Sequence, residues 1–228
     1  MSEFLHFSEH TLQEVALAIM AIVYTLRIIW FLRFTAGKER QGRTGSQRTT
    51  PAIGFIYSWA NIAMPWAMES TRTKWFLYVQ FVIFHIGVVA AISLSFIIPY
   101  GAAILENAVV VLFLQLIIGA ACLVGILRFI RRVSDPYMRA ISSPDDFFSL
   151  ILLTVWFFFG VLAAPNNLAH GEWHLITFFL LTAFFLIYVP FSKISHYLYY
   201  PFTRYYFGKT MAYRGVYPIK RQSGTRAV

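Results

Sequence analysis

Five apolar runs, each about 20 residues long, limit the folds that this chain can adopt, because that length crosses a bilayer. The predicted spans cover residues 12–34, 75–98, 107–130, 147–164 and 173–190. Of the 228 residues, 58% are hydrophobic, which is more than a soluble domain of this size carries. Since a bilayer core offers no partners to backbone amides, spans of this kind form helices. The sequence therefore predicts an all-α integral membrane bundle of five transmembrane helices.

Lysine and arginine alternate between the loops of this plan. The loop after the first span, the loop after the third and the C-terminal segment are basic, whereas the N-terminus and the other two loops contain neither residue. The basic residues after the third span are Arg128, Arg131, Arg132 and Arg139. By the positive-inside rule we expect the N-terminus outside and the C-terminus in the cytoplasm, in a prokaryotic cytoplasmic membrane. The net charge of +9 then follows from topology, and we expect no nucleic-acid partner.

Residues 51–68 form a shorter apolar stretch that two prolines interrupt. A crossing here would place Arg72 and Lys74 on the side opposite the basic loop that precedes the stretch, which the positive-inside rule disfavours. We therefore expect an interfacial or re-entrant segment, with Trp59 and Trp66 at headgroup level.

The remaining organisation is simple. Residues 1–200 are expected to form the transmembrane domain and residues 201–228 a basic cytoplasmic tail, with the fifth helix continuing past residue 196. The acidic N-terminus predicts no signal peptide.

Ala121 and Gly125 in the third span would allow a close helix approach, and Ser143 is expected to cap the fourth helix. The single cysteine, Cys122, excludes a disulfide framework within this chain.

His85 lies inside the second span, with apolar residues on both sides. An ionisable side chain at that depth is costly, so His85 is a candidate functional residue. His196 lies at the cytoplasmic end of the fifth span. We interpret the two imidazoles as axial ligands of one haem iron, a bis-histidine arrangement suited to electron transfer. An interhelical hydrogen bond is the alternative for His85, and a histidine at an interface, such as His196, needs no ligand.

The chain resembles the membrane cytochrome b subunit of respiratory nitrate reductase, its gamma subunit. The resemblance rests on the five-span plan, on His85 followed by Gly87, and on residues 190–196, which read PFSKISH. Residues 69–75 (ESTRTKW) and 201–204 (PFTR) look closer to relatives of that subunit. These relatives are the membrane cytochromes of heterodisulfide reductase and of the sulfite-reductase-linked complex of sulfate reducers.

The resemblance implies a ligand set. In the nitrate reductase subunit two haems b are held by two histidines on the second helix and two on the fifth. His85 and His196 match the ligands of the cytoplasmic-side haem, whereas the outer ligand positions hold Ser95 and Phe178. The resemblance with this departure implies one haem b rather than two, and it leaves open a second haem through His174, one turn before Phe178.

Two further pairs of residues are candidates for the site. Lys193 lies one turn before His196, and it or Arg204 would meet the haem propionates at the cytoplasmic edge; snorkelling to headgroups is the alternative for Lys193. His170 and His174, four residues apart at the outer surface, would handle protons beside a quinone pocket, although histidines are common at a helix start.

These features predict a mono-haem cytochrome b that anchors a respiratory complex. It would pass electrons between the membrane quinone pool and an iron–sulfur or other redox centre of a cytoplasmic-side partner, so any catalysis belongs to the complex. The basic tail fits such a partner and also fits anionic lipid headgroups. A haem-free quinone-binding or purely structural anchor is one alternative. A small transporter or channel subunit is another, although the spans contain no Asp, Glu, Lys or Arg near their centres.

Overall fold

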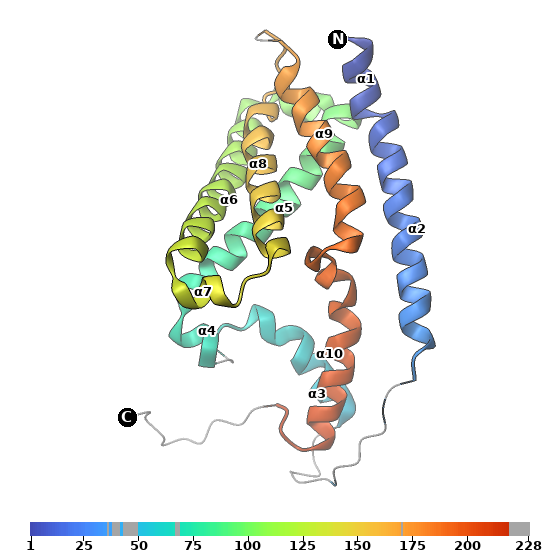
Figure 1. Ribbon diagram of the computed structural model, residues 1–228, viewed down its shortest axis with the longest axis vertical. Coiled ribbons are helices and arrows are strands. Elements are labelled where there is room, and N and C mark those ends of the chain that lie inside the picture. The colour runs from blue at the N-terminus through green and yellow to red at the C-terminus, as the bar shows by residue number, and fades with distance from the viewer. Residues whose placement is uncertain (36, 38–41, 43–49, 67–68, 170, 219–228) are drawn as a thin grey trace. The chain divides into compact units, whose positions relative to one another are not determined.

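The computed structural model describes residues 1–35, 37, 42, 50–66, 69–169 and 171–218. Every regular element in these ranges is a helix (Figure 1). The chain divides into two compact units: unit 1 comprises Met1–Trp30 and Val79–Ser195, and unit 2 comprises Phe31–Tyr78 and His196–Val228. Four arginines and lysines of the predicted basic loop lie outside the described residues: Lys38, Arg40, Arg43 and Arg48.

Within the described residues, five helical segments are long and apolar enough to cross a membrane. They are Glu3–Arg33, Trp75–Tyr100, Ala108–Ser134, Pro144–Ala163 and Trp173–Phe191. Each overlaps one predicted span, although the first begins nine residues earlier than predicted, so the prediction of a five-helix membrane bundle is confirmed. The first segment consists of α1 (Glu3–Glu9) and α2 (Thr11–Arg33); the others are α5 (Trp75–Tyr100), α6 (Ala108–Ser134), α8 (Pro144–Ala163) and α9 (Trp173–Tyr188) with the 3-10 turn η3 (Val189–Phe191).

In unit 1, α6 packs along α8, α8 packs along α9, and α1 packs against α9 (Figure 1). The short helix α7 (Pro136–Ala140) joins α6 to α8. The core between α8 and α9 is aromatic, because Trp156 stacks on Phe178 and Phe185 with ring centroids 6.0 and 5.1 Å apart. The indole N–H of Trp156 donates to Thr182 Oγ1 at 2.8 Å, so the polar atom of this buried ring is satisfied.

Small residues set the close helix contacts of α6, as the Ala121 and Gly125 pattern predicts. A Cβ atom on Gly87 of α5 would lie 2.1 Å from the Cβ of Ala121, and one on Gly125 would lie 2.4 Å from Thr154 Oγ1 of α8. One residue of the pair therefore brings α6 close to α5, and the other brings it close to α8.

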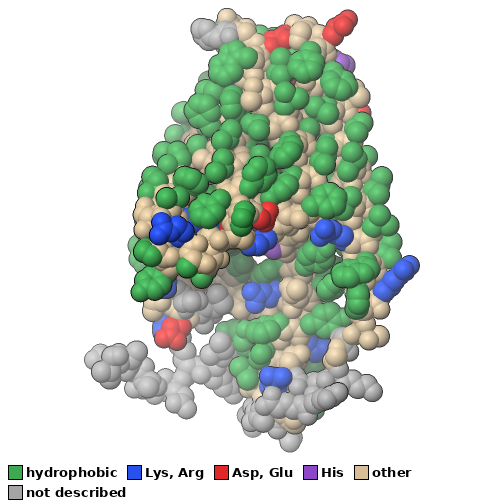
Figure 2. Space-filling view, in the orientation of Figure 1, with side chains coloured by type: hydrophobic (Ala, Val, Ile, Leu, Met, Phe, Trp, Pro, Cys, Tyr) green, Lys and Arg blue, Asp and Glu red, His purple; other side chains and the backbone are tan. Residues whose placement is uncertain are grey.

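The surface of unit 1 is apolar between two polar ends. Figure 2 shows hydrophobic side chains spread over its helices, with acidic groups at the end that holds α1. Exposed residues of α6 include Leu112, Phe113 and Leu116, which cover a face that no other described helix buries. Such a surface suits contact with lipid chains, in agreement with the membrane-spanning helices.

In unit 2, α3 (Pro51–Ala60) packs against α10 (His196–Tyr213). A Cβ on Gly54 would lie 2.4 Å from the carbonyl oxygen of Gly208, so the two backbones touch where only glycine fits. The indole N–H of Trp59 donates to the carbonyl of Pro201 at 3.2 Å. At ten residues, α3 is about 15 Å long and does not span a bilayer, as expected for the stretch at 51–68.

The short elements η1 (Asn61–Ala63) and α4 (Glu69–Thr73) follow α3 in unit 2. The hydroxyl of Tyr78 donates to the Ile62 carbonyl at 2.9 Å and so joins the start of α5 to η1. The side chains of Trp59 and Trp66, which are expected at headgroup level, are both exposed.

The prediction that the fifth helix continues past residue 196 is wrong. After Tyr188 the chain forms η3 and a second 3-10 turn, η4 (Lys193–Ser195), before α10 begins. Pro190 has no N–H to continue an α-helix, and Ser192 adopts an extended backbone with ψ 171°. The Ser192 hydroxyl accepts from the backbone N–H of Ile194 at 3.2 Å, which satisfies a donor that a helix would have bonded.

Residues 201–213, which were expected to begin a tail, continue α10 instead. Their contacts with α3 account for this, because Gly208 and Ala212 are buried against it. Three basic residues of the predicted tail lie outside the described residues: Lys220, Arg221 and Arg226.

Candidate functional site

His85 lies on α5 within unit 1, and its side chain is partly exposed. Its Nδ1 atom is 2.7 Å from the carbonyl oxygen of Phe81, one helical turn earlier. Since a carbonyl oxygen only accepts hydrogen bonds, Nδ1 carries the hydrogen in this contact. A neutral His85 therefore has its lone pair on Nε2, and a hydrogen bond of this kind at the other ring nitrogen is what orients metal-binding histidines.

Aromatic rings from its own helix surround the His85 imidazole. The Phe81 ring lies 4.1 Å from it between centroids, and the Phe84 ring meets it edge-on at 6.3 Å. Phe84 is buried and packs in turn against Phe157 of α8 at 5.2 Å. These contacts and the hydrogen bond to Phe81 restrict the orientation of the imidazole.

Arg128 of α6 contacts the same aromatic layer. Its guanidinium carbon lies 5.5 Å from the centroid of Phe84, in cation–π geometry. The charge pattern of the sequence predicts Arg128 only as part of a basic loop, although its position within the predicted span 107–130 is the available signal for burial. Arg128 lies inside α6, and its side chain is half-buried. Its charge is therefore next to Phe84, the residue that precedes His85.

His196 is the first residue of α10 and belongs to unit 2. Its side chain is exposed, and its ring meets that of Tyr197 edge-on at 6.5 Å. The two predicted axial ligands therefore belong to different units, with His85 in unit 1 and His196 in unit 2.

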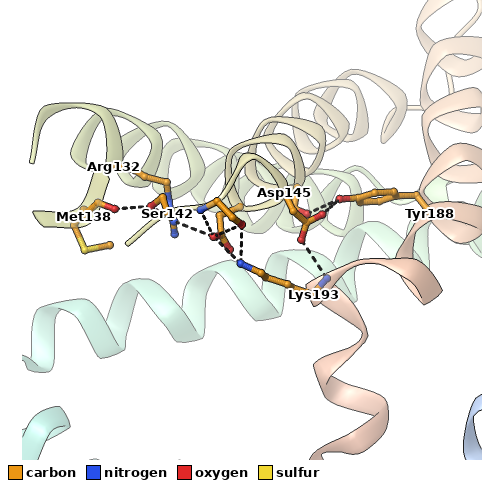
Figure 3. Close-up of polar contacts among 9 residues, drawn as sticks. Arg132, Met138, Ser142, Asp145, Tyr188 and Lys193 are labelled. Carbon is orange, nitrogen blue, oxygen red and sulfur yellow. Dashed lines mark hydrogen bonds and ion pairs between the residues drawn. The ribbon is translucent and has the colours of Figure 1, made fainter. Parts of the chain in front are cut away.

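Lys193, a predicted propionate partner, takes part in a polar network at the start of α8 (Figure 3). Its ammonium group donates to Asp146 Oδ2 at 2.8 Å and to Ser143 Oγ at 2.7 Å. The same carboxylate oxygen accepts from the backbone N–H of Ser143 at 2.8 Å, so Ser143 and Asp146 form the predicted cap of the fourth helix. In this structure the Lys193 charge serves that cap.

The neighbouring carboxylate, Asp145, extends the network to α9 (Figure 3). It accepts a short hydrogen bond from the Tyr188 hydroxyl and another from the backbone N–H of Lys193 at 3.3 Å. Tyr188 also contacts the Ser149 hydroxyl at 3.0 Å. The end of α9 and the turn η4 are thereby fastened to α8 within unit 1.

Arg204, the other predicted propionate partner, lies on α10 eight residues after His196. Its guanidinium carbon lies 5.3 Å from the centroid of Tyr200 and 6.0 Å from that of Phe207. Both rings belong to α10, so the described contacts of Arg204 are cation–π contacts within one helix.

Phe178 and Ser95, at the positions that the resemblance assigns to outer haem ligands, are both buried. Phe178 is fully buried and stacks on Trp156. Ser95 is buried on α5, where its hydroxyl donates to the Ile92 carbonyl at 2.7 Å. Phe178 therefore takes part in helix packing, and the Ser95 hydroxyl is satisfied within α5.

His174 lies in the first turn of α9 and is only 7% exposed, although it was expected at the outer surface. The docking of α1 against α9 explains the burial, since it covers this end of the helix. The Trp173 ring meets the imidazole edge-on at 5.6 Å. His170, its predicted partner in proton handling, lies outside the described residues.

A further group of titratable residues lies at the α1 end of unit 1. The rings of His6 and His10 are 4.7 Å apart, and His10 Nε2 lies 3.6 Å from the buried Glu9 carboxylate. The hydroxyl of Tyr100 donates to Glu14 at 3.0 Å beside them. Even so, no set of three or more His, Cys, Asp or Glu residues in the described chain has an arrangement that would hold a metal ion.

No family model, curated protein or solved structure matches this chain. The resemblance to the nitrate reductase gamma subunit therefore rests on the motifs of the sequence itself.

Proposed function

We propose that this chain is a mono-haem cytochrome b subunit that anchors a respiratory complex in a prokaryotic cytoplasmic membrane. In this proposal His85 and His196 are the axial ligands of one haem b. Electrons pass between the membrane quinone pool and an iron–sulfur or other redox centre of a partner subunit. The observation that carries the proposal is the hydrogen bond from Nδ1 of His85 to Phe81, which leaves the lone pair on Nε2, inside a membrane-spanning helix.

This hydrogen bond is compatible with ligation and limits the competing interpretation of His85 to Nε2. A histidine retained for an interhelical hydrogen bond would direct a ring N–H to another helix. Here the Nδ1–H donates within the same helix, so Nε2 is the atom that would bind the iron. The donor set thus fits a haem iron, which takes imidazole nitrogen as an axial ligand.

A haem with two histidine ligands carries one electron and has no open coordination position for oxygen chemistry. The chain would supply the imidazoles, their orientation and a low-dielectric setting. For orientation, the Phe81 carbonyl accepts a hydrogen bond from Nδ1 and so holds one edge of the His85 ring in place. For a low dielectric, the residue next to His85, Phe84, packs against Phe157 of α8.

The proposed topology places the N-terminus outside and the C-terminus in the cytoplasm. Its support is the distribution of charge, with Glu3 and Glu172 at the α1 end of unit 1 and Arg131 and Arg139 at the α7 end. The exposed basic residues of α10, such as Lys209, would then face the cytoplasm, where a redox partner with a negative surface or anionic lipid would bind them.

The test is spectroscopic. The chain purified in mild detergent should show a low-spin b-type α band in its dithionite-reduced minus air-oxidised spectrum, with one haem per chain. His85→Ala and His196→Ala should each lose the pigment while circular dichroism and size-exclusion chromatography show a folded protein. His174→Ala is the matched control, and it should retain the haem.

Three results would contradict the proposal. A folded wild-type chain without haem would favour the haem-free anchor. Pigment retained by either ligand variant and lost with His174→Ala would assign the ligand to α9 instead. Haem that menadiol fails to reduce in a membrane containing the chain would remove the link to quinones.

A further inference from the structure

Arg128 is a positive charge set well inside a membrane-spanning helix. It lies six residues before the end of α6 at Ser134, which is about 9 Å along the helix axis. Its side chain is half-buried, whereas the neighbouring Arg131 is exposed. Burial of a guanidinium at this depth is costly unless an anion offsets its charge.

The described part of the chain supplies no such anion. The contact of Arg128 there is with the Phe84 ring, and no described carboxylate pairs with it. The nearest acidic pair along the chain serves other groups, because Asp146 binds Lys193 and Ser143 while Asp145 binds Tyr188. The five N–H donors of the guanidinium suit a carboxylate from outside the chain, which they bind in bidentate fashion.

The position of Arg128 relates it to the candidate haem ligand. Phe84 precedes His85, and its ring contacts both the Arg128 guanidinium, at 5.5 Å, and the His85 imidazole, at 6.3 Å. All three residues belong to unit 1. A haem held by His85 would therefore lie beside the same aromatic residue as a cation for which the described chain supplies no anion.

We propose that Arg128 binds a propionate carboxylate of the haem that His85 ligates, as a positioning residue of that site. This inference rests on the proposed function. It also gives two basic residues different roles: Arg128 binds the haem propionate, whereas the Lys193 ammonium is bonded to the α8 cap in unit 1. A lipid phosphate is the competing anion, but Arg131, exposed and nearer the helix end, is better placed for headgroups.

The experiment compares Arg128→Gln with Arg131→Gln, which removes the same charge from the next turn of the same helix. Loss of a cation beside the haem favours the oxidised form, so the midpoint potential of Arg128→Gln should fall. We expect about a tenfold change in the ratio of oxidised to reduced haem at fixed potential, or about 59 mV for one electron. Arg131→Gln should leave the potential at the wild-type value, and Arg128→Lys should restore part of the shift.

A second measurement uses haem dimethyl ester, in which both propionates are esterified. Apo-protein reconstituted with ordinary haem should retain less pigment in Arg128→Gln than in wild type. With the diester the two proteins should retain equal amounts, because the carboxylate that Arg128 binds is absent. This comparison keeps the inference testable if Arg128→Gln loses its haem during purification.

The failures are distinguishable. A haem protein in which Arg128→Gln and Arg131→Gln have the same potential would overturn the inference alone and assign Arg128 to lipid phosphate. A loss of pigment in Arg128→Gln that persists with the diester would also overturn the inference alone. A folded wild-type chain that binds no haem would overturn the proposed function, and this inference with it.

Discussion

The ammonium group of Lys193 lies 2.8 Å from the carboxylate of Asp146, 47 residues earlier in the chain. Asp146 also accepts two hydrogen bonds from Ser143, at the backbone N–H and at the hydroxyl, each 2.8 Å long. The pair therefore joins the turn η4 to the N-terminus of α8 within unit 1. Lys193, which is predicted to meet a haem propionate, is therefore bonded to the cap of α8 in this structure.

We predict that Asp146→Ala destabilises the fold by about 1 kcal/mol, because the α8 cap loses its acceptor. Lys193→Ala should cost only a few tenths of a kcal/mol, since the Lys193 side chain is 60% exposed and solvent screens its charge. In the double variant the two losses should not add, because both remove the same contact. Unfolding by SDS in detergent micelles measures all three.

Glu106→Ala is the control for this cycle, because Glu106 is an exposed acidic residue outside the network. Its unfolding curve should match that of the wild type. Strict additivity of Asp146→Ala and Lys193→Ala would mean that the ammonium is not bound to Asp146, and it would return Lys193 to the candidates for a haem propionate.

Gly87 should tolerate no side chain, because the Cβ of an alanine there would lie 2.1 Å from the Cβ of Ala121. Gly87→Ala must push α5 away from α6, at an expected cost of about 1–3 kcal/mol. The matched variant is Gly119→Ala on α6, whose new Cβ would meet only Val161 at an ordinary 3.8 Å. It should be neutral or slightly stabilising, since alanine favours helix over glycine. Equal thermal stability of the two variants would contradict the close approach of the helices.

Thr182 should matter more than its size suggests, because its hydroxyl accepts from the buried indole of Trp156 at 2.8 Å. Thr182→Val keeps the shape and leaves that N–H without its acceptor, so we expect a loss of about 1 kcal/mol. Thr177→Val on the same helix is the control. Thr177 is only partly buried and donates to the Trp173 carbonyl one turn earlier, so its loss should change stability by a few tenths of a kcal/mol. A Thr177→Val variant less stable than Thr182→Val would refute this assignment.

The spans could be predicted from the sequence because each depends on local composition. An apolar run of sufficient length must form a helix in a bilayer, and Ser143 with Asp146 three residues later is a local capping signal. The break after α9 was missed even though Pro190 was visible, because prolines are tolerated in membrane helices. It depends on Ser192, whose side chain bonds the backbone on both sides.

The polar contacts of the candidate site could not be predicted, because they join residues far apart in the chain. Lys193 and Asp146 form a pair across 47 residues, and Arg128 meets Phe84 across 44. His85 could be identified from the sequence, because the free-energy cost of an ionisable side chain in an apolar run depends on the run itself. Its bond to Phe81 is a local contact, but a sequence does not say which ring nitrogen turns towards the helix.

The attachment of α1 should weaken in acid, because it depends on Glu172 in the loop before α9. The carboxylate accepts from the backbone N–H of Ser2 at 2.7 Å, and the hydrogen bonds from Ser2 lower the pKa of Glu172. A folded pKa below the unfolded value, about 4.3, stabilises the attachment above that pH, and the effect is lost as the pH falls through the folded pKa. Hydrogen exchange of the α1 amides, corrected for the intrinsic rates, should therefore lose protection as the pH falls below about 4. Glu172→Gln should have low protection in α1 already at neutral pH and should lack this component of the acid dependence. If the variant and the wild type lose protection in parallel, another group, such as Glu9, controls the attachment.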